Sequence, residues 1–326
     1  MNSFNAFRIH ETGARHQTLS LDQLSPGEVT LRVHWSGINY KDALAGTGKG
    51  RILRRFPLVG GVDLAGVVVS SSDALFSPGE PVLVTGCGLS ETRDGGYSDY
   101  ARVPAEAVVK LPPGLSLRHA MAIGTAGFAA ALAIMQLEHN GLAPGQGPVA
   151  VTGATGGVGL LAIDMLSQRG YEVTAITRKP DHAPLLRRVG ASAVEPLPAP
   201  GGKPLEPERW AGAIDNVGGA VLAQLLAGTR MQGSVAAVGL AGGSQLTSSL
   251  MPFLLRGVNL LGVNSAATKR EKRLKVWERI AGELAPGHLD QIVTRIVSLA
   301  DLPQAFASLI DGSNAGRTLV RIHDER

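Results

Sequence analysis

Cysteine is almost absent from this chain of 326 residues, in which Cys87 is the only one. A single thiol forms no disulfide within the chain, so the sequence favours a reducing compartment, and we expect a cytoplasmic protein. One cysteine also excludes a structural zinc site built from several thiolates. The eight histidines do not fall at a ligand spacing such as H-x-x-x-H. We therefore expect no metal in the chemistry of this protein.

Long hydrophobic runs and strong net charge are missing as well. The N-terminal stretch MNSFNAFRIHETG lacks the basic and apolar segments of a signal peptide. The longest uncharged run, residues 121–137, is rich in Gly and Ala and slightly short for a membrane span, so it predicts a buried helix. A net charge of +4 does not by itself indicate nucleic acid. We expect a soluble protein that binds a small molecule rather than a membrane or a nucleic acid.

The first third of the chain and the part after residue 148 differ in pattern. Residues 28–39 and 61–72 alternate apolar and polar side chains, and residues 80–86 form a short apolar run, so all three segments predict strands. After residue 148, short apolar strands alternate with helical segments. That alternation predicts a parallel sheet with helices on both faces. A Pro-rich segment, residues 195–208, interrupts it and predicts a surface loop.

These patterns predict an α/β protein with two domains, which the length of the chain allows. We expect a β-rich domain formed by residues 1–121 and 267–326. A doubly wound parallel-sheet domain, residues 122–266, would be inserted into it. Residues 268–284 predict a charged helix that precedes the C-terminal tail. The basic residues of this helix favour a solvated face, with contact between one of the arginines and the cofactor phosphate as the alternative; they are Lys269, Arg270, Lys272, Arg273 and Lys275.

A glycine turn between a strand and a helix is the clearest local motif. The segment VAVTGATGGVG carries Gly153, Gly156 and Gly159 as G-x-x-G-x-x-G. The first glycine permits a tight turn, the second lets the backbone approach a pyrophosphate, and the third lets the helix pack close to the sheet. The free N–H groups of the helix would then face the anion. An ordinary tight turn is the alternative, but the flanking strand and helix favour a dinucleotide site. Its predicted contacts are Gly153, Thr155, Gly156, Gly157, Val158 and Gly159.

Two basic residues stand where the following strand ends. An acid at this position often holds the ribose 2′-OH of NAD, whereas here the chain reads Thr177, Arg178, Lys179. Arginine and lysine would attract a 2′-phosphate, and the threonine would donate a hydrogen bond to it. A solvated basic loop is the alternative. We expect NADPH as the cofactor, bound in part by these three residues.

Several longer motifs follow one another in an order that resembles a known family. They are NYKDALAGTGKG, GGVDLAGVV, GGYSDYARV, MAIGTAGFAAAL, VTGATGGVG, AGAIDNVGG, MPFLLRGVNLLGVNS and GRTLV. The chain resembles the zinc-independent medium-chain dehydrogenases/reductases, specifically the bacterial NADPH-dependent acryloyl-CoA reductases, also described as YhdH/YhfP-type quinone oxidoreductases. GGVDLAG stands where zinc-dependent relatives have Gly-His-Glu. The resemblance implies a GroES-like catalytic domain, a Rossmann domain, an active site in the cleft between them, and a cytoplasmic homodimer.

The resemblance also implies roles for individual residues. Tyr40 would lie at the nicotinamide as catalytic and cofactor-binding residue, and its phenol would either transfer a proton or only position NADPH. Arg317 matches a position near the cofactor. Asn216 and Leu260 match backbone contacts to the dinucleotide. Asn39 flanks Tyr40 and is a candidate for substrate binding, whereas Asp42 is either a further polar group or a structural turn acid paired with Lys41.

A basic segment follows the tyrosine motif. A coenzyme A thioester carries phosphates that such a segment would bind. The alternative is a solvated basic surface with no role in binding. The candidate residues are Lys49, Arg51, Arg54 and Arg55. The expected reaction is metal-free hydride transfer from NADPH to the C=C bond of a short enoyl-CoA, most simply acryloyl-CoA to propionyl-CoA. A quinone or enone oxidoreductase, and a non-catalytic NADPH-binding protein similar to zeta-crystallin, remain as alternatives.

Overall fold

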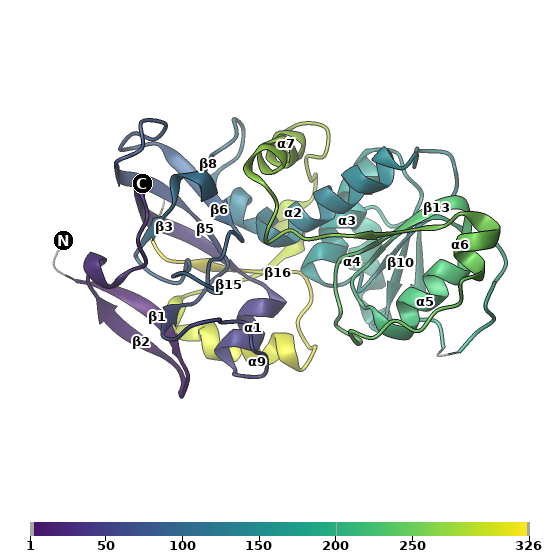
Figure 1. The fold of residues 1–326 in the computed structure, drawn as a ribbon, viewed down its shortest axis with the longest axis horizontal. Helices are drawn as coiled ribbons and strands as arrows, with labels where there is room; N and C mark the ends of the chain where they lie inside the picture. Colours follow the sequence, from purple (N-terminus) through teal and green to yellow (C-terminus); the bar gives the residue numbers. More distant parts are fainter. Residues whose placement is uncertain (1–2, 200, 325–326) are drawn as a thin grey trace. The chain divides into compact units, whose positions relative to one another are not determined.

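The computed structural model describes residues 3–199 and 201–324, which fold into two compact units (Figure 1). The first unit comprises Met1–Thr125, Ser265–Ala281 and Val293–Arg326, and the second comprises Ala126–Asn264 and Gly282–Ile292. Residues 282–292 thus fold with the second unit, although the sequence placed them in the first.

Contacts with helix α3 (Gly157–Gln168) explain where residues 282–292 fold. Buried Asp164 of α3 accepts a hydrogen bond from the backbone N–H of His288 at 2.9 Å and lies 2.9 Å from its Nδ1. Arg169, just after α3, pairs with Glu283. These partners are more than a hundred residues apart in the chain, so the helical pattern gave no signal of them.

The first unit is built on strands, as its sequence predicts. A seven-stranded sheet has the order β15-β16-β3-β5-β6-β8 with β7 beside β3, and a smaller sheet has the order β2-β1-β4. The strands are β1 (Phe4–His10), β2 (Gly13–Leu19), β3 (Val29–Ile38), β4 (Leu58–Val59), β5 (Asp63–Ser71), β6 (Pro81–Thr85), β7 (Tyr100–Val103), β8 (Val109–Lys110), β15 (Val293–Val297) and β16 (Arg317–Arg321). The helical elements are η1 (Leu21–Gln23), α1 (Tyr40–Gly46), η2 (Ala105–Ala107), α7 (Arg270–Ala281), η4 (Leu299–Asp301) and α9 (Leu302–Ile310).

Strand β3 is more deeply buried than its alternating sequence suggests. Only Arg32 of its ten residues is exposed, so the expected polar face does not form. The reason is that β3 lies inside the sheet and pairs with β16, β5 and β7. Its C-terminal end leads directly into α1, and the two helices α1 and α9 contact each other.

The second unit contains the predicted parallel sheet. Its six strands have the order β11-β10-β9-β12-β13-β14, which is the arrangement of two mononucleotide-binding halves. The strands are β9 (Val149–Thr152), β10 (Val173–Thr177), β11 (Ala193–Pro196), β12 (Trp210–Asp215), β13 (Thr229–Ala237) and β14 (Asn259–Gly262). Besides α3, the helical elements of this unit are η3 (Pro180–His182), α4 (Ala183–Arg188), α5 (Gly219–Gly228), α6 (Met251–Arg256) and α8 (Leu289–Ile292).

Strand β11 corrects one expectation. The sequence predicted a loop over residues 195–208, yet Glu195 and Pro196 end a four-residue strand that pairs in parallel with β10. A short edge strand of mixed polarity gives little periodic signal, and a proline is tolerated at such an edge. No helix or strand is assigned to the described residues between Pro196 and Trp210; residue 200 lies outside the described range.

The long uncharged segment forms helix α2 (Leu117–His139), which is interrupted where Gly124 takes φ 51° and ψ −157°. By length and composition this helix could cross a membrane, but 83% of its most apolar window is buried inside the fold. It is therefore a core helix, as the sequence predicts. The division between the two units falls inside it, after Thr125.

Candidate active site

The start of helix α1 is held by a reciprocal cap. Asn39 is the N-cap residue, and its backbone N–H donates to Asp42 Oδ2 at 2.8 Å. The backbone N–H of Val62 donates to the other oxygen of Asp42 at 2.9 Å. Asp42 is therefore the structural turn acid that the sequence allowed. Its expected pairing with Lys41 is wrong, because Lys41 Nζ lies 2.7 Å from Glu91 Oε1 and forms an ion pair with it.

Tyr40 is the first residue of α1 and is 43% exposed. Its hydroxyl has no hydrogen-bond partner within residues 3–199 and 201–324. The capped helix therefore presents a phenol whose donor and acceptor capacity is available to a ligand. The backbone of Tyr40 is fixed by the cap, while the ring extends beyond the packed core.

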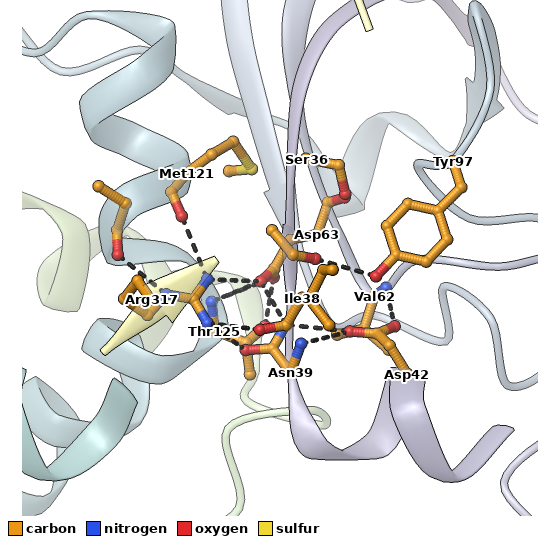
Figure 2. A network of polar contacts seen from close by, with 12 residues as sticks. Ser36, Ile38, Asn39, Asp42, Val62, Asp63, Tyr97, Met121, Thr125 and Arg317 are labelled. Atoms are coloured by element: carbon orange, nitrogen blue, oxygen red, sulfur yellow. Dashed lines mark hydrogen bonds and ion pairs between the residues drawn. The ribbon is translucent and has the colours of Figure 1, made fainter. Parts of the chain in front are cut away.

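Asp63 lies behind this cap and is fully buried (Figure 2). It is the acid of the segment GGVDLAG, at the start of β5. The Nδ2 of Asn39 donates to Asp63 at 2.7 Å, and the backbone N–H of Thr125 donates to it at 3.0 Å. The hydroxyl of Thr125 is a further donor to the same carboxylate. Asp63 thereby joins the helix cap of α1 to the interrupted part of α2.

Arg317 completes the buried network and is only 2% exposed. Its guanidinium donates to the backbone oxygens of Ile38, Ala122 and Met121 at 2.9, 3.1 and 3.2 Å. It also donates to Asn39 Oδ1 at 3.0 Å (Figure 2). The sequence expected Arg317 to bind the cofactor. Its hydrogen bonds inside the first unit favour a positioning role, and its predicted contact with the cofactor stays a prediction.

Asn39 is likewise engaged by its neighbours rather than free for substrate. Its amide group donates to Asp42 and Asp63 and accepts from Arg317. All N–H donors of the side chain are used. These contacts favour Asn39 as a positioning residue for Tyr40, and its predicted contact with substrate stays a prediction.

Gly124 of α2 packs against the side chains of Asp63 and Arg317. A Cβ atom on Gly124 would lie 2.7 Å from Asp63 Oδ2 and 2.8 Å from Arg317 Nη2. The positive φ of Gly124 is also unfavourable for other residues. Both facts explain why a glycine stands at this position, where the long apolar helix is interrupted.

Burial changes the protonation of the network. It raises the pKa of Asp42 to about 7, with the negative charge of Asp63 as the second cause. It also raises the pKa of Tyr97 well above its usual range, and the Tyr97 hydroxyl donates to the backbone oxygen of Gly37 at 3.2 Å. Burial lowers the pKa of Arg317, an effect that Asp63 and Asp42 oppose. The network therefore contains a carboxyl group that titrates near neutral pH.

The glycine turn of the second unit has the form expected of a pyrophosphate cradle. Strand β9 ends at Thr152, Gly153 takes φ 58°, and α3 begins at Gly157. A Cβ on Gly159 would lie 2.5 Å from the backbone oxygen of Gly153, so a side chain would push the helix away from the strand. The remaining predicted residues of the turn, Thr155, Gly156 and Val158, lie between these points or in the first turn of α3.

Asn216 lies beside this turn. Its Nδ2 donates to the backbone oxygen of Thr152 at 2.8 Å, and its backbone N–H donates to the Thr152 hydroxyl at 3.0 Å. The Oδ1 of Asn216 is buried and has no hydrogen-bond partner among the described residues. Asp215, whose pKa is raised by burial, accepts from Thr152 and Gly218. The ends of β9 and β12 are thus joined by side chains next to the glycines.

The predicted 2′-phosphate residues lie at the end of β10. Thr177 is buried, and its hydroxyl accepts from the backbone N–H of Lys179 at 3.0 Å. Arg178 is exposed and forms no ion pair or hydrogen bond with any described residue. Its guanidinium is available for an anion at the position where an acid would select NAD.

The position of Leu260 gives less support to its predicted role. Leu260 lies on the edge strand β14 opposite Val235, with β12 and β13 between this strand and β9. Three strand spacings amount to about 14 Å, which separates Leu260 from the glycine turn. Its predicted backbone contact with the dinucleotide stays a prediction.

The basic segment before β4 is mostly solvated. Lys49, Arg51 and Arg54 have exposed side chains. Arg55 is tied down, since its Nε donates to the backbone oxygen of Thr92 and its Nη2 to Ser25 Oγ, both at 2.7 Å. The role of these side chains in substrate binding stays a prediction.

No group of three or more His, Cys, Asp or Glu side chains able to hold a metal ion occurs among the described residues. The metal-free reaction remains a prediction, which chelation can test.

Known proteins share both units. Residues 25–113 match the family model described as alcohol dehydrogenase GroES-like domain, and residues 157–281 match the one described as zinc-binding dehydrogenase. Acrylyl-CoA reductase AcuI of Ruegeria pomeroyi is 46% identical over 96% of each chain. The chain belongs to the AcuI–YhdH–YhfP family. This membership confirms the family predicted from the sequence motifs.

Solved structures of AcuI–YhdH–YhfP relatives confirm the predicted GroES-like and Rossmann fold. The yhdH oxidoreductase of Salmonella enterica, in complex with NADP, has a TM-score of 0.93 at 44% identity and covers 98% of this chain and 99% of its own. YhfP of Bacillus subtilis, which carries the name of a quinone oxidoreductase, is 46% identical over 94% of each chain. Its structure with NAD bound has a TM-score of 0.96.

The sequence missed Asp63, Thr125 and Tyr97 as members of the site. In the sequence, the segment GGVDLAG indicates only the loss of a zinc ligand set and no role for its acid. A buried acid at the same place, with a threonine 62 residues later as its donor, has no local spacing that a sequence pattern would reveal.

Proposed function

We propose that this protein is an NADPH-dependent oxidoreductase that reduces the C=C bond of a short enoyl-CoA, with acryloyl-CoA to propionyl-CoA as the leading reaction. The observation that carries the proposal is the exposed phenol of Tyr40 on a helix cap held by a buried network. The relationship to an acrylyl-CoA reductase over almost the whole chain supports the substrate class.

The residues of the second unit fit the cofactor. We assign the pyrophosphate to the glycine turn at Gly153–Gly159, the 2′-phosphate to Thr177, Arg178 and Lys179, and a further contact to Asn216. The unpartnered Oδ1 of Asn216 beside the turn supports this assignment. NADPH, when bound, supplies the hydride that adds to the β-carbon of the substrate.

Tyr40 is assigned to the substrate carbonyl or the α-carbon. Negative charge develops on the carbonyl oxygen as the β-carbon accepts a hydride, and a positioned hydrogen-bond donor stabilises it. The phenol of Tyr40 either donates that hydrogen bond or transfers the proton that the α-carbon gains. Asn39, Asp63 and Arg317 act through Tyr40 by fixing the first turn of α1.

A quinone or enone oxidoreductase is the second candidate, favoured by the name of YhfP. NADPH oxidation should be followed with acryloyl-CoA, crotonyl-CoA, a free enone and a simple quinone. A kcat/KM for acryloyl-CoA at least 100-fold above that for the quinone supports the proposal. The reverse order rejects it, and cofactor binding without turnover of any acceptor indicates a non-catalytic protein.

We also propose that the protein is a cytoplasmic homodimer. Strand β14 is an unpaired edge of the parallel sheet, and apolar side chains on it and on the nearby elements are exposed. These residues are Met231, Leu250, Met251, Leu254, Leu255 and Leu260. Exposed apolar side chains on and near an unpaired sheet edge favour an interface with a second copy. Light scattering coupled to gel filtration tests the mass, and a monomer at micromolar concentration would contradict the proposal.

A further inference from the structure

A cavity of about 460 Å³ lies within the first unit, apart from the network around Asp63. Its walls come from the loop after β6, from η2, from the segment that leads into α7 and from the first turn of α7. Its charged lining residues are Arg93, Glu106, Lys269, Arg270 and Arg273. The volume is in the range of pockets that bind small organic molecules.

The cavity is strongly basic. Arg93, Lys269, Arg270 and Arg273 face it together with a single acid, Glu106. None of the four cations forms an ion pair with any residue in the described ranges. Arg273 is only 7% exposed. A buried cation without a counter-ion is unfavourable, so this arrangement is suited to an anion from outside the chain.

Two of the arginines are held in place by backbone oxygens. Arg270 Nη1 donates to the carbonyl oxygens of Ala105, Glu106 and Val108 at 3.2, 3.0 and 2.8 Å. Arg273 donates to the carbonyl oxygens of Glu106 and Thr268 at 3.0 and 2.8 Å. Neutral carbonyls orient these guanidinium groups without cancelling their charge. The sequence expected both residues on a solvated face, which is wrong for buried Arg273 and for half-buried Arg270.

Arg93 offers a donor that nothing in the fold uses. Its Nε is buried and has no hydrogen-bond partner among the described residues. Arginine presents a fork of donors that matches two oxygens of a phosphate. An orphaned donor together with two pre-oriented guanidinium groups is the arrangement expected of a phosphate site.

The loop that carries Arg93 is connected to the helix of Tyr40. Glu91 forms the ion pair with Lys41, the second residue of α1, and its backbone oxygen accepts from the N–H of Arg54 at 2.8 Å. Arg55 donates to the backbone oxygen of Thr92 at 2.7 Å. The basic segment Arg51–Arg55 therefore adjoins the cavity loop, and its exposed arginines extend the positive charge.

We propose that this cavity binds the phosphorylated nucleoside end of the coenzyme A thioester. The inference rests on the proposed function, because it names the part of that substrate that carries phosphate. Arg93, Arg270 and Arg273 contact the phosphate oxygens, and Lys269 adds charge at the cavity wall. The ligand chemistry is an organic phosphate with a nucleoside attached, which distinguishes it from free inorganic phosphate.

A titration tests the cavity without turnover. Adenosine 3′,5′-bisphosphate is titrated by calorimetry into the full-length protein saturated with NADP⁺, so that the dinucleotide site is filled. We expect one further site, weakened about 10-fold or more by Arg93→Gln, since a charged hydrogen bond is lost. Arg15→Gln, a change of an exposed arginine on β2, should leave binding unchanged. Lys269→Gln, a change at an exposed side chain of the cavity wall, is a second variant that should also weaken binding.

Three results of the titration would overturn the proposal. They are no further site, equal affinity in the wild-type protein and both cavity variants, and equal affinity for inorganic phosphate and the bisphosphate. The last result would indicate a general anion site with no part in holding a nucleoside. Adenosine alone should not bind, because it lacks the phosphates that the arginines require.

Kinetics separate this inference from the proposed function. Acryloyl-CoA is compared with acryloyl-pantetheine, a thioester without phosphate. Arg93→Gln should raise KM about 10-fold for the CoA ester, leave kcat unchanged, and have no effect with the pantetheine ester. Equal effects on both esters would overturn the inference. If the wild-type protein reduces neither thioester, the proposed function fails, and the bisphosphate titration still decides whether the cavity binds a nucleoside phosphate.

Discussion

Arg317 Nη1 donates hydrogen bonds to the backbone oxygen of Ile38 and to the side-chain oxygen of Asn39, at 2.9 and 3.0 Å. An arginine on the last strand of the chain thereby fixes the residue that caps the helix of Tyr40. The two residues are 278 positions apart. The orientation of the candidate catalytic tyrosine therefore depends on the closure of the first unit by its C-terminal strand.

Tyr40→Phe should lower kcat by roughly 100-fold, the low end for loss of a general acid. The ring is retained, so cofactor packing should change little. Steady-state kinetics at saturating NADPH measure the effect. A raised KM for NADPH with kcat unchanged would instead assign Tyr40 to positioning, because this is the signature of lost uniform binding.

Arg317→Lys should lower the free energy of unfolding by about 2–5 kcal/mol, because lysine keeps the charge but cannot replace the fork of buried hydrogen bonds. Denaturant titration measures it. At 25 °C, where the variant is still folded, kcat should fall about 10- to 100-fold through misplacement of Tyr40. Arg321→Lys, on the exposed end of the same strand, is the matched control. A destabilised variant with normal kcat would show that the network supports only the fold.

Asp42→Asn should flatten the dependence of stability on pH. The folded pKa of about 7 lies above the reference value of 3.8, so the folded state binds the proton more tightly than the unfolded state. The stabilisation from the protonated carboxyl is full below about pH 4 and is lost as pH rises through 7. The difference amounts to at most about 4 kcal/mol.

Unfolding free energies of wild type and Asp42→Asn at pH 5, 6, 7 and 8 check this expectation. The substituted amide does not titrate. It has only one oxygen, so one of the two backbone N–H groups that donate to Asp42 loses its acceptor. This loss shifts the unfolding free energy by an amount that does not depend on pH. Asp181→Asn, at an exposed carboxylate, should leave the wild-type slope unchanged. Parallel curves for wild type and Asp42→Asn would contradict the prediction.

Arg178→Ala should weaken NADPH binding by about 10- to 150-fold, the loss of one charged hydrogen bond worth roughly 1.5–3 kcal/mol. NADH binding should barely change, because NADH has no 2′-phosphate. Fluorescence titration with both cofactors measures the ratio, and Arg187→Ala on the exposed side of α4 is the control. Equal losses for the two cofactors would show that Arg178 does not read the phosphate.

Exhaustive treatment with a chelator should leave the reductase activity intact. The expected mechanism uses a phenol and pre-oriented donors rather than a Lewis acid. Metal analysis of the purified protein and activity before and after dialysis against chelator provide the measurement. A stoichiometric zinc ion that restores lost activity would overturn the metal-free assignment.

The nucleotide-binding unit was predictable because its signals are local. Strands and helices of the second unit repeat with their own periods, and Gly153 to Gly159 determine a turn within seven residues. The basic pair after Thr177 is likewise adjacent in sequence to the strand that presents it. The weak edge strand Ala193–Pro196 was missed, since four residues of mixed polarity carry no period.

The candidate site was only partly predictable, because its contacts join distant segments. The motif containing Tyr40 is visible in the sequence, but the network behind it assembles Asn39, Asp63, Thr125 and Arg317 from the N-cap of α1, from β5, from α2 and from β16. In the same way, a run of basic residues on a helix looks solvated in the sequence, yet Arg270 and Arg273 turn toward the carbonyl oxygens of residues 105–108. Local periodicity determines which elements form, whereas hydrogen bonds between buried polar groups depend on which elements the fold brings together.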